Sequence, residues 1–191
     1  MSDIFRCFGD GIPVYEDYHD HEWGRPVHDD LKLFEMLNLE GAQAGLSWIT
    51  VLKKRESYRE AFDSFDPYKI VRYDDAKIEE LMGNAGIIRN RLKINAVITN
   101  ARLYIDIVEK HGSFDSFIWG YVDGKPVVGH WSSFEEMPLT TPLSDKISKD
   151  LKKMGFKFVG STIIYSFMQA VGMVNDHLTK CFVYQELMKG K

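Results

Sequence analysis

The sequence predicts an all-α protein. Apolar residues recur with a helical period through most of the 191 residues, and patterns typical of β-strands are few. The apolar share of 45% is sufficient for a packed core, and the length suits one domain. We therefore expect a single α-helical domain over residues 1–191. No run of 18 apolar residues occurs, so no membrane-spanning segment is expected.

Three segments carry the clearest helical period. Apolar residues repeat at i, i+3, i+4 and i+7 over residues 94–108. A second helix is expected over 143–154, where Thr141 and Pro142 fit the N-cap and the first turn, and a third over 164–171. Shorter helices are expected at 30–39, 47–53, 55–63, 74–83 and 113–119, with Asp74 and Ser113 as N-caps of the last two.

Two regions are expected to lack helix. The stretch "YVDGKPVV" at 121–128 contains an Asp-Gly turn and indicates a small β-hairpin, and the rest of 120–141 is expected to be loop. The first thirty residues are expected to be mostly irregular. Because loop backbone needs hydrogen-bond partners, another part of the chain must hold this segment in place.

The charge distribution leaves nucleic-acid binding open. The net charge of −4 lacks the basic excess of most DNA-binding proteins. Residues 16–30 are strongly acidic, whereas 53–55, 89–93 and 149–157 are basic and can form one basic face or simply solvated helix surfaces. With two cysteines and no signal-peptide pattern, we expect a reduced protein of the cytosol.

The stretch "VNDHLTKCF" pairs a histidine with a cysteine near the end of the chain. A helix capped by Asn175 or Asp176 would put His177 and Cys181 one turn apart on the same face. An imidazole and a thiolate at that spacing can reach one metal ion. The alternative is that both are ordinary packed residues, since cysteine is often buried without any ligand.

The N-terminal part offers a second such pair. It contains Cys7 and then His19, with His21 and His28 as competing histidines. Two thiolates and two imidazoles complete a tetrahedral zinc site and leave no position for water, so the zinc would be structural. Such an ion would tie the irregular N-terminal segment to the C-terminal helix.

Aromatic and acidic residues form a second group. They lie in "YEDYHDHEWG" at 15–24 and "LEGAQAGLSW" at 39–48, and the candidate pocket residues are Tyr15, Tyr18, Trp23, Glu40 and Trp48. A carboxylate among aromatic rings suits a flat, cationic ligand. Gly41 and Gly45 interrupt a helical run and indicate either a tight loop that inserts into a partner or a plain helical corner with a buried tryptophan.

The stretch "LMGNAGIIRNRLKINAVITNA" at 81–101 has the layout of a helix-hairpin-helix element, with outer limits of about 74–108. A turn containing Gly83 and Gly86 separates a short helix from a long one. Backbone amides in such a turn can hold a phosphate group. The nearby cations are Arg89, Arg91 and Lys93. The alternative is an ordinary connection between two helices.

Four long segments resemble the bacterial DNA-3-methyladenine glycosylase I family. They are "YHDHEWG" (18–24), "LFEMLNLEGAQAGLSWITVLKKRESYREAF" (33–62), "AGIIRNRLKINAVITNA" (85–101) and "LKKMGFKFVGSTIIYSFMQAVGMVNDHLTKC" (151–181). They occur in the family's order, and the resemblance extends over almost the whole chain. The resemblance implies the all-α helix-hairpin-helix DNA glycosylase fold. It also implies a structural zinc that joins the N- and C-terminal segments, 7–19 and 177–181, through Cys7, His19, His177 and Cys181.

The resemblance further assigns the pocket. It implies that Glu40 reads the damaged adenine, that Tyr18 and Trp48 stack on or border it, and that Tyr15 and Trp23 are neighbours. It implies that loop 42–46 enters the duplex. The DNA-contacting candidates are Gln43, Gly45, Leu46, Gly86, Arg89 and Arg91. One departure stands out, because many family members have a tryptophan two residues after the first cysteine, where this chain has Gly9 preceded by Phe8.

The family implies a DNA repair enzyme of the bacterial cytosol, expected to act as a monomer. It would flip 3-methyladenine out of alkylated double-stranded DNA and hydrolyse the N-glycosidic bond, leaving an abasic site without cutting the strand. Three alternatives remain from the residues. A non-catalytic lesion-binding protein would use the same scaffold, a catalytic zinc hydrolase would need an open coordination position, and a small-molecule binder would use the aromatic pocket alone.

Overall fold

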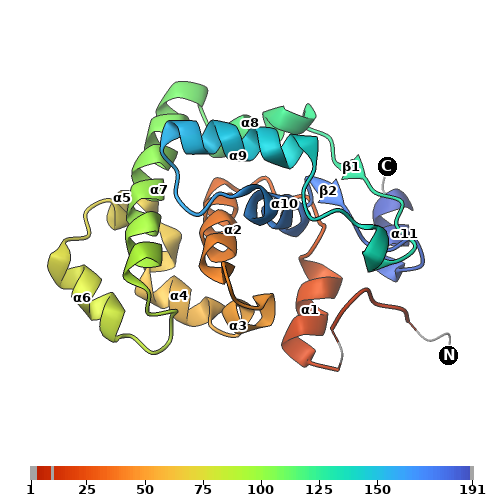
Figure 1. Ribbon diagram of the computed structural model, residues 1–191, viewed down its shortest axis with the longest axis horizontal. Helices are drawn as coiled ribbons and strands as arrows, with labels where there is room; N and C mark the ends of the chain where they lie inside the picture. Colours follow the sequence, from red (N-terminus) through yellow and green to blue (C-terminus); the bar gives the residue numbers. More distant parts are fainter. Residues whose placement is uncertain (1–3, 10, 190–191) are drawn as a thin grey trace.

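The computed structural model describes residues 4–9 and 11–189, and helices dominate this part of the chain (Figure 1), as the sequence predicts. The α-helices are α1 (Pro13–His21), α2 (Asp30–Gln43), α3 (Trp48–Leu52), α4 (Arg55–Ala61), α5 (Pro67–Ile70), α6 (Asp75–Gly83), α7 (Arg91–His111), α8 (Phe114–Trp119), α9 (Pro142–Met154), α10 (Ser161–Ala170) and α11 (Phe182–Lys189). Three short 3-10 helices and two short strands are η1 (Asp63–Phe65), η2 (Gly120–Val122), η3 (Phe134–Glu136), β1 (Val127–Val128) and β2 (Val174–Asn175).

Helix α2 occupies the centre of the fold. Every residue from 33 to 42 is buried, so this helix is enclosed on all sides rather than on one apolar face. Helices α3, α7, α8 and α10 contact it (Figure 1). The carboxylate of Asp30 in its first turn accepts hydrogen bonds from the backbone N–H groups of Phe114 and Asp115, which fixes the start of α8 against α2.

The predicted helix boundaries agree with the capping residues. Asp74 accepts a hydrogen bond from the N–H of Lys77 at the start of α6, and Ser113 accepts one from Ser116 at the start of α8. Thr141 caps α9 in a reciprocal arrangement with Ser144. These side chains satisfy N–H groups that the first helical turn leaves without partners, which explains why the helices begin there.

The hairpin predicted at 121–128 is wrong. Asp123 adopts a left-handed conformation and the N–H of Gly124 donates to the carbonyl of Trp119, so the Asp-Gly pair ends a 3-10 turn. Strand β1 then pairs in parallel with β2, and Val127 lies opposite Val174. A partner 47 positions further along the chain cannot be identified from local turn chemistry.

Most of the described residues among the first thirty lie outside helices, as predicted, although Pro13 starts the nine-residue helix α1. One expectation near the C-terminus is wrong. His177 and Cys181 do not lie on a helix. Asn175 belongs to strand β2 and its side chain accepts the N–H of His177, so the chain turns through 176–181 and only then enters α11.

The apolar residues form one large buried cluster and a smaller one. The large cluster includes buried residues of α2, α7, α8, α9 and α10. The smaller cluster is centred on Cys181, Val183 and Tyr184, and Cys7 packs against it. The N-terminal segment therefore meets the C-terminal helix directly. None of the helices among the described residues has both the length and the hydropathy needed to cross a bilayer.

Gly172 lies where two backbone segments meet closely. Its φ is +72°, and a Cβ there would stand 2.3 Å from the carbonyl carbon of Arg25 and 2.4 Å from the nitrogen of Pro26. Gly112 also has a positive φ, +86°, but no atom lies within 4 Å of a Cβ built on it. A substitution at Gly112 would therefore test the effect of the positive φ alone, whereas one at Gly172 would add a steric clash with residues 25 and 26.

We expect Gly172→Ala to lower the free energy of unfolding by about 3 kcal/mol or more, because backbone atoms cannot yield to the new methyl group. Gly112→Ala serves as the control and is expected to cost about 1 kcal/mol through its backbone conformation alone. Urea unfolding of both variants measures the difference. Equal costs would show that the contact with residues 25 and 26 does not constrain position 172.

Candidate functional site

Four side chains from opposite ends of the chain meet in one cluster. The ligand atoms of Cys7, His19, His177 and Cys181 all lie within 4.8 Å of one another. The Cys181 Sγ lies 3.4 Å from His19 Nε2 and 3.5 Å from His177 Nδ1, and Cys7 Sγ lies 3.6 Å from His177 Nδ1. The structure thus brings together the four residues expected to hold a metal, although 170 positions separate Cys7 from His177.

The outer nitrogen of each imidazole is held by a hydrogen bond. His19 Nδ1 lies 2.8 Å from Asp20 Oδ1, and His177 Nε2 lies 2.8 Å from the carbonyl of Trp23. Arg6 in turn holds the Asp20 carboxylate with two nitrogens. These contacts leave His19 Nε2 and His177 Nδ1 facing the cluster, which is how outer groups orient histidine ligands.

The geometry and chemistry of the cluster fit zinc. In a tetrahedral site with Zn–S and Zn–N bonds of usual length, sulfur and nitrogen ligands lie about 3.5 Å apart. The sulfur–nitrogen separations of 3.4 to 3.6 Å agree with that spacing. Hydrogen bonding between the thiols lowers the pKa of Cys181 and raises that of Cys7. Two thiolates and two imidazoles would fill a four-coordinate ion completely.

The competing histidines point elsewhere. His21 pairs with Asp17 at 2.9 Å on the exposed side of α1. His28 pairs with Asp115 at 2.8 Å and stacks on Trp119, with 4.3 Å between ring centroids. Neither belongs to the cluster.

An aromatic group adjoins the metal-ligand cluster. Its predicted members are Tyr15, Tyr18, Trp23 and Trp48, and the structure adds Phe8 in the middle. The Phe8 centroid lies 4.7 Å from Tyr15 and 5.1 Å from Trp23, and Tyr18 lies 5.3 Å from Trp48. Sequence reasoning treated Phe8 only as a departure from the family pattern. The signal that could have identified it is its place directly after Cys7.

Side chains of the aromatic group are in direct contact with the histidines of the metal-ligand cluster. The Phe8 ring meets His19 edge-on at 4.9 Å, and Trp23 meets His177 at 4.6 Å. A side chain at position 9 would not fit, because a Cβ on Gly9 would lie 2.6 Å from Glu16 Cγ. Phe8 therefore supplies the aromatic ring on this side of the group.

Glu40 is a buried carboxylate in the last turns of α2. It is 4% exposed, and it accepts no side-chain hydrogen bond from any described residue. Burial raises its pKa to about 8. Burial and then the nearby charge of Glu40 also raise the pKa of Tyr18. The carboxylate is thus electrostatically coupled to the aromatic group.

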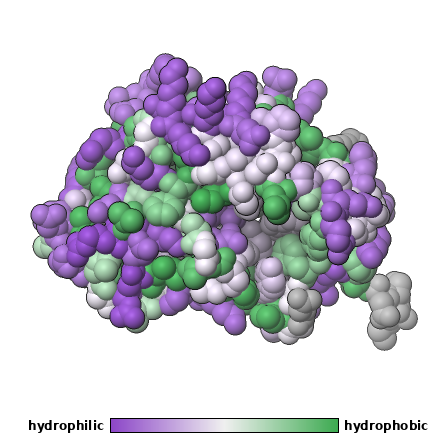
Figure 2. Space-filling model, in the orientation of Figure 1, coloured by the Kyte–Doolittle hydropathy of each residue, from purple (hydrophilic) through white to green (hydrophobic). Residues whose placement is uncertain are grey.

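Trp48 contributes a second polar group without a partner. Its indole Nε1 is buried, and no acceptor for it exists among the residues that the structure describes. Buried polar groups are normally paired, so this unpaired donor indicates a place for a ligand with an acceptor. The Trp48 ring contacts Tyr18, whose pKa is raised by burial and then by the charge of Glu40. Figure 2 shows this face of the molecule hollowed near its centre, where α1, α2 and α10 come together in Figure 1.

Loop 42–46 leaves the end of α2 just beyond Glu40. Gly45 has a φ of +77°, and the N–H of Leu46 donates to the carbonyl of Gln43, which folds the loop tightly. Gly45 and Leu46 are exposed and Gln43 is half-buried. The predicted probes Gln43 and Leu46 therefore lie on this loop, on the same end of α2 as the carboxylate, with Leu46 exposed at the surface.

The predicted phosphate-binding turn is the segment 84–90 between α6 and α7. The N–H of Gly86 donates to Asn84 Oδ1 at 2.7 Å within the turn. Arg89 is exposed, and Arg91 pairs with Glu79 at 2.6 Å on the surface. Exposed ion pairs of this kind are weak, so Arg91 can exchange Glu79 for another anion at little cost. Lys93 points away from solvent, toward the end of α2.

Comparisons with known proteins converge on one family. A family model described as methyladenine glycosylase matches residues 9–184. The chain is 54% identical over 172 residues to DNA-3-methyladenine glycosylase 1 of Escherichia coli K12, covering 90% of this chain and 92% of that protein. A crystal structure of a 3-methyladenine DNA glycosylase I superposes with a TM-score of 0.91 at 54% identity, covering 93% of this chain and 98% of the other. A variant 3-methyladenine DNA glycosylase I in complex with 3-methyladenine superposes with a TM-score of 0.89 at 40% identity, covering 92% and 95%.

The burial of Glu40 makes stability depend on pH. The folded protein holds the Glu40 proton up to a pKa of about 8, against an ordinary value of 4.5, so between these values it binds more protons than the unfolded chain. At low pH Glu40 is protonated in both states and does not reduce stability. As pH rises toward and through about 8, the free energy of unfolding falls, because the folded protein keeps a proton that the unfolded chain has lost. Glu40→Gln carries no charge and escapes this loss.

We expect the stability of Glu40→Gln relative to wild type to rise by about 3 kcal/mol between pH 5 and pH 8.5. Urea unfolding at both pH values measures it. Because other titrating groups are the same in both proteins, their contributions cancel in the difference. A difference that stays constant over this range would show that Glu40 is ionised in the folded protein at neutral pH.

Proposed function

Because this chain belongs to the methyladenine glycosylase family and is a DNA glycosylase, we propose that it excises 3-methyladenine from alkylated double-stranded DNA by hydrolysis. The observation that carries this proposal is the buried Glu40 carboxylate, close enough to the Tyr18 ring for its charge to add to burial in raising the pKa of that residue. The solved complex of a similar glycosylase with 3-methyladenine supports the identity of the base.

The pocket chemistry favours a cationic purine. Methylation at N3 gives adenine a positive charge, and electron-rich rings such as Tyr18 and Trp48 attract a flat cation. The positive charge also favours the ionised form of Glu40 and offsets the cost of its burial. As a carboxylate, Glu40 accepts hydrogen bonds from the exocyclic amine. Neutral adenine offers the ring stacking but no charge, so the pocket discriminates between the two.

The reaction needs little acid catalysis. A cationic base leaves its sugar as a neutral molecule, and the N-glycosidic bond is therefore already weak. The role of the protein is to turn the base out of the duplex, bind it and admit water to the sugar carbon, which produces an abasic site. The ammonium of Lys93 is engaged by two backbone carbonyls, which supports hydrolysis without a Schiff base or strand cleavage.

The DNA contacts follow from the two exposed elements near the pocket. Helices α6 and α7 with turn 84–90 serve as a helix-hairpin-helix that holds the phosphate backbone through amides and Arg89. Gln43 and Leu46 on loop 42–46 fill the gap that the flipped base leaves. We propose that the protein acts as a monomer, with all these elements in one domain.

The metal proposal is a structural zinc. Cys7, His19, His177 and Cys181 would hold the ion, and zinc when bound would stabilise the fold by joining the two ends of the chain. Its protein ligands leave no position for a substrate or water. The zinc would therefore take no part in the reaction. The contacts of Phe8 with His19 and of Trp23 with His177 connect the metal-ligand cluster to the pocket.

The first test is release of the free base from methylated duplex DNA, identified by chromatography. We expect wild type to release 3-methyladenine, and Glu40→Gln to release it about 100-fold more slowly, because the variant cannot stabilise a cation. Glu109→Gln, on the exposed side of α7, is the charge-matched control and should keep the wild-type rate. Methylated DNA that is bound without release would instead identify a non-catalytic lesion-binding protein.

The second test concerns the metal. Elemental analysis of the purified protein is expected to find about one zinc per chain, and Cys181→Ala is expected to lose it and to melt more than about 10 °C lower. Val183→Ala, which removes buried atoms from the same small cluster, is the control that keeps the ligands. Wild-type protein that contains no metal and melts like Cys181→Ala would refute the structural zinc.

A further inference from the structure

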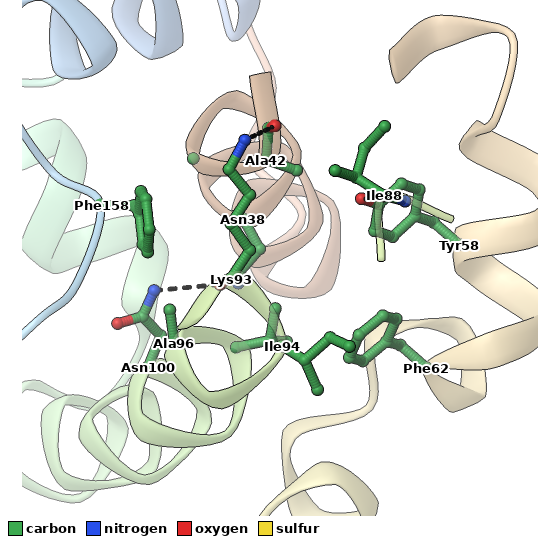
Figure 3. Close-up of a pocket in the computed structure, with 12 residues that line it drawn as sticks. Asn38, Ala42, Tyr58, Phe62, Ile88, Lys93, Ile94, Ala96, Asn100 and Phe158 are labelled. Atoms are coloured by element: carbon green, nitrogen blue, oxygen red, sulfur yellow. Dashed lines mark hydrogen bonds between the residues drawn. The ribbon is translucent and has the colours of Figure 1, made fainter. Parts of the chain in front are cut away.

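Lys93 makes an unusual contact with the end of α2. It lies in the first turn of α7, and its ammonium donates hydrogen bonds to the carbonyls of Ala42 at 2.8 Å and Ala44 at 2.7 Å. Figure 3 shows the side chain reaching from α7 toward the end of α2, with its bond to Ala42 drawn. Ala42 is in the last turn of α2, and Ala44 is the first residue after the helix.

The contact satisfies the carbonyl end of a helix. The last carbonyls of a helix have no partner within it and carry partial negative charge, so a cation there is favourable. Many helices end with a glycine that allows the chain to fold back on these carbonyls, but α2 ends at Ala44 with φ −45° and ψ 117°. Lys93 supplies the missing donors from another helix.

The ammonium has no alternative ion partner nearby. No carboxylate of the described residues forms an ion pair with Lys93, and burial lowers its pKa. The stem of the side chain lines a cavity of only about 10 Å³ together with Asn38, Gly41 and Phe158. Asn100 donates to Asn38 beside it, as Figure 3 shows. The cavity has no room for a ligand, so the stem packs against protein atoms and the two hydrogen bonds place the ammonium.

The two ends of Lys93 lie on different parts of the DNA-binding surface. Its backbone follows the turn 84–90, and its own N–H donates to Asn90, the N-cap of α7. Its ammonium holds Ala42 and Ala44, which flank Gln43. One side chain therefore spans from the turn that would hold the phosphate backbone to the loop that would enter the duplex.

We propose that Lys93 is a positioning residue that holds loop 42–46 in the conformation that displaces the base from the duplex. The inference rests on the proposed base excision. Lys93 does not contact the base, and it acts through the backbone of the loop. The ammonium of Lys93 bonds to Ala42 and Ala44, whereas Glu40 is on α2 and Tyr18 is on α1, so we expect binding of the free base by these two residues to depend little on this contact.

The central experiment compares two forms of the same methylated oligonucleotide. Under single-turnover conditions we expect Lys93→Met to excise 3-methyladenine from duplex DNA at least about tenfold more slowly than wild type, because a misplaced loop fails to displace the base. From single-stranded DNA, where no partner strand has to be displaced, the loss should be less than about threefold. The enzyme concentration for half-maximal rate should stay unchanged.

Two control variants define the interpretation. Lys110→Met removes the same charge from the exposed last turn of α7 and is expected to behave as wild type. Lys93→Arg keeps a charged donor for the two carbonyls and should restore most of the duplex activity. If Lys93→Met does not fold, Lys93→Gln replaces it as the variant without the charge. Equal losses on both DNA forms, an unchanged rate, or a change only in half-saturation and salt dependence would each overturn the proposal. The last of these would identify a phosphate contact.

A measurement without DNA separates this inference from the proposed function. Hydrogen exchange of the amides of residues 43–47 in the free protein should be at least about tenfold faster in Lys93→Met than in Lys110→Met, because the loop is released. If wild type excises no methylated base, the proposed function fails, and this exchange experiment still decides whether Lys93 holds the loop. Equal exchange in the two variants would overturn that role.

Discussion

Helix α2 is enclosed by protein over residues 33–42, and the other features of the structure depend on that enclosure. If one face of this helix were exposed to solvent, the Glu40 side chain could reach water and the pKa of Glu40 would stay at its usual value. Surrounded by α3, α7, α8 and α10, the carboxylate stays near the aromatic rings and its pKa rises to about 8. The same enclosure fixes the point where the chain leaves α2, which sets the position of loop 42–46 relative to Glu40.

The aromatic group depends on contacts between the two ends of the chain. Phe8 packs on His19, and Trp23 packs on His177, so the imidazoles of the metal-ligand cluster form part of the wall behind the rings. In the short N-terminal segment, Phe8 packs on the aromatic group and Cys7 packs against the small cluster around Cys181. Pocket and metal-ligand cluster are therefore one structural unit, in which a structural ion would set the spacing of rings it never touches.

Local features of the structure could be predicted from the sequence, and long-range ones could not. The helix expected at 94–108 is part of α7, and Asp74 and Ser113 cap helices as expected, because periodicity and caps involve neighbouring residues. The β1–β2 pairing, the turn that presents His177 and Cys181, and the place of Phe8 all depend on distant partners. The contact of Lys93 with Ala42 and Ala44 was missed for the same reason, since the sequence shows a basic segment but not its target. The family resemblance supplied the metal-ligand set and the pocket residues that spacing alone left open.

The separation of Cys7 from His177 has a consequence for synthesis of the protein. A ribosome that has made α2, α3 and α7 has already released the residues that carry Glu40 and Trp48, but 170 positions separate Cys7 from its histidine partner. Until that last part emerges, the segment with Phe8 has only its contacts with α1 and Trp23, and the His177 ring behind Trp23 is missing. A prematurely terminated chain that lacks residues 177–181 would therefore have Glu40 and the aromatic rings but not the imidazole and thiol that join the two ends of the chain.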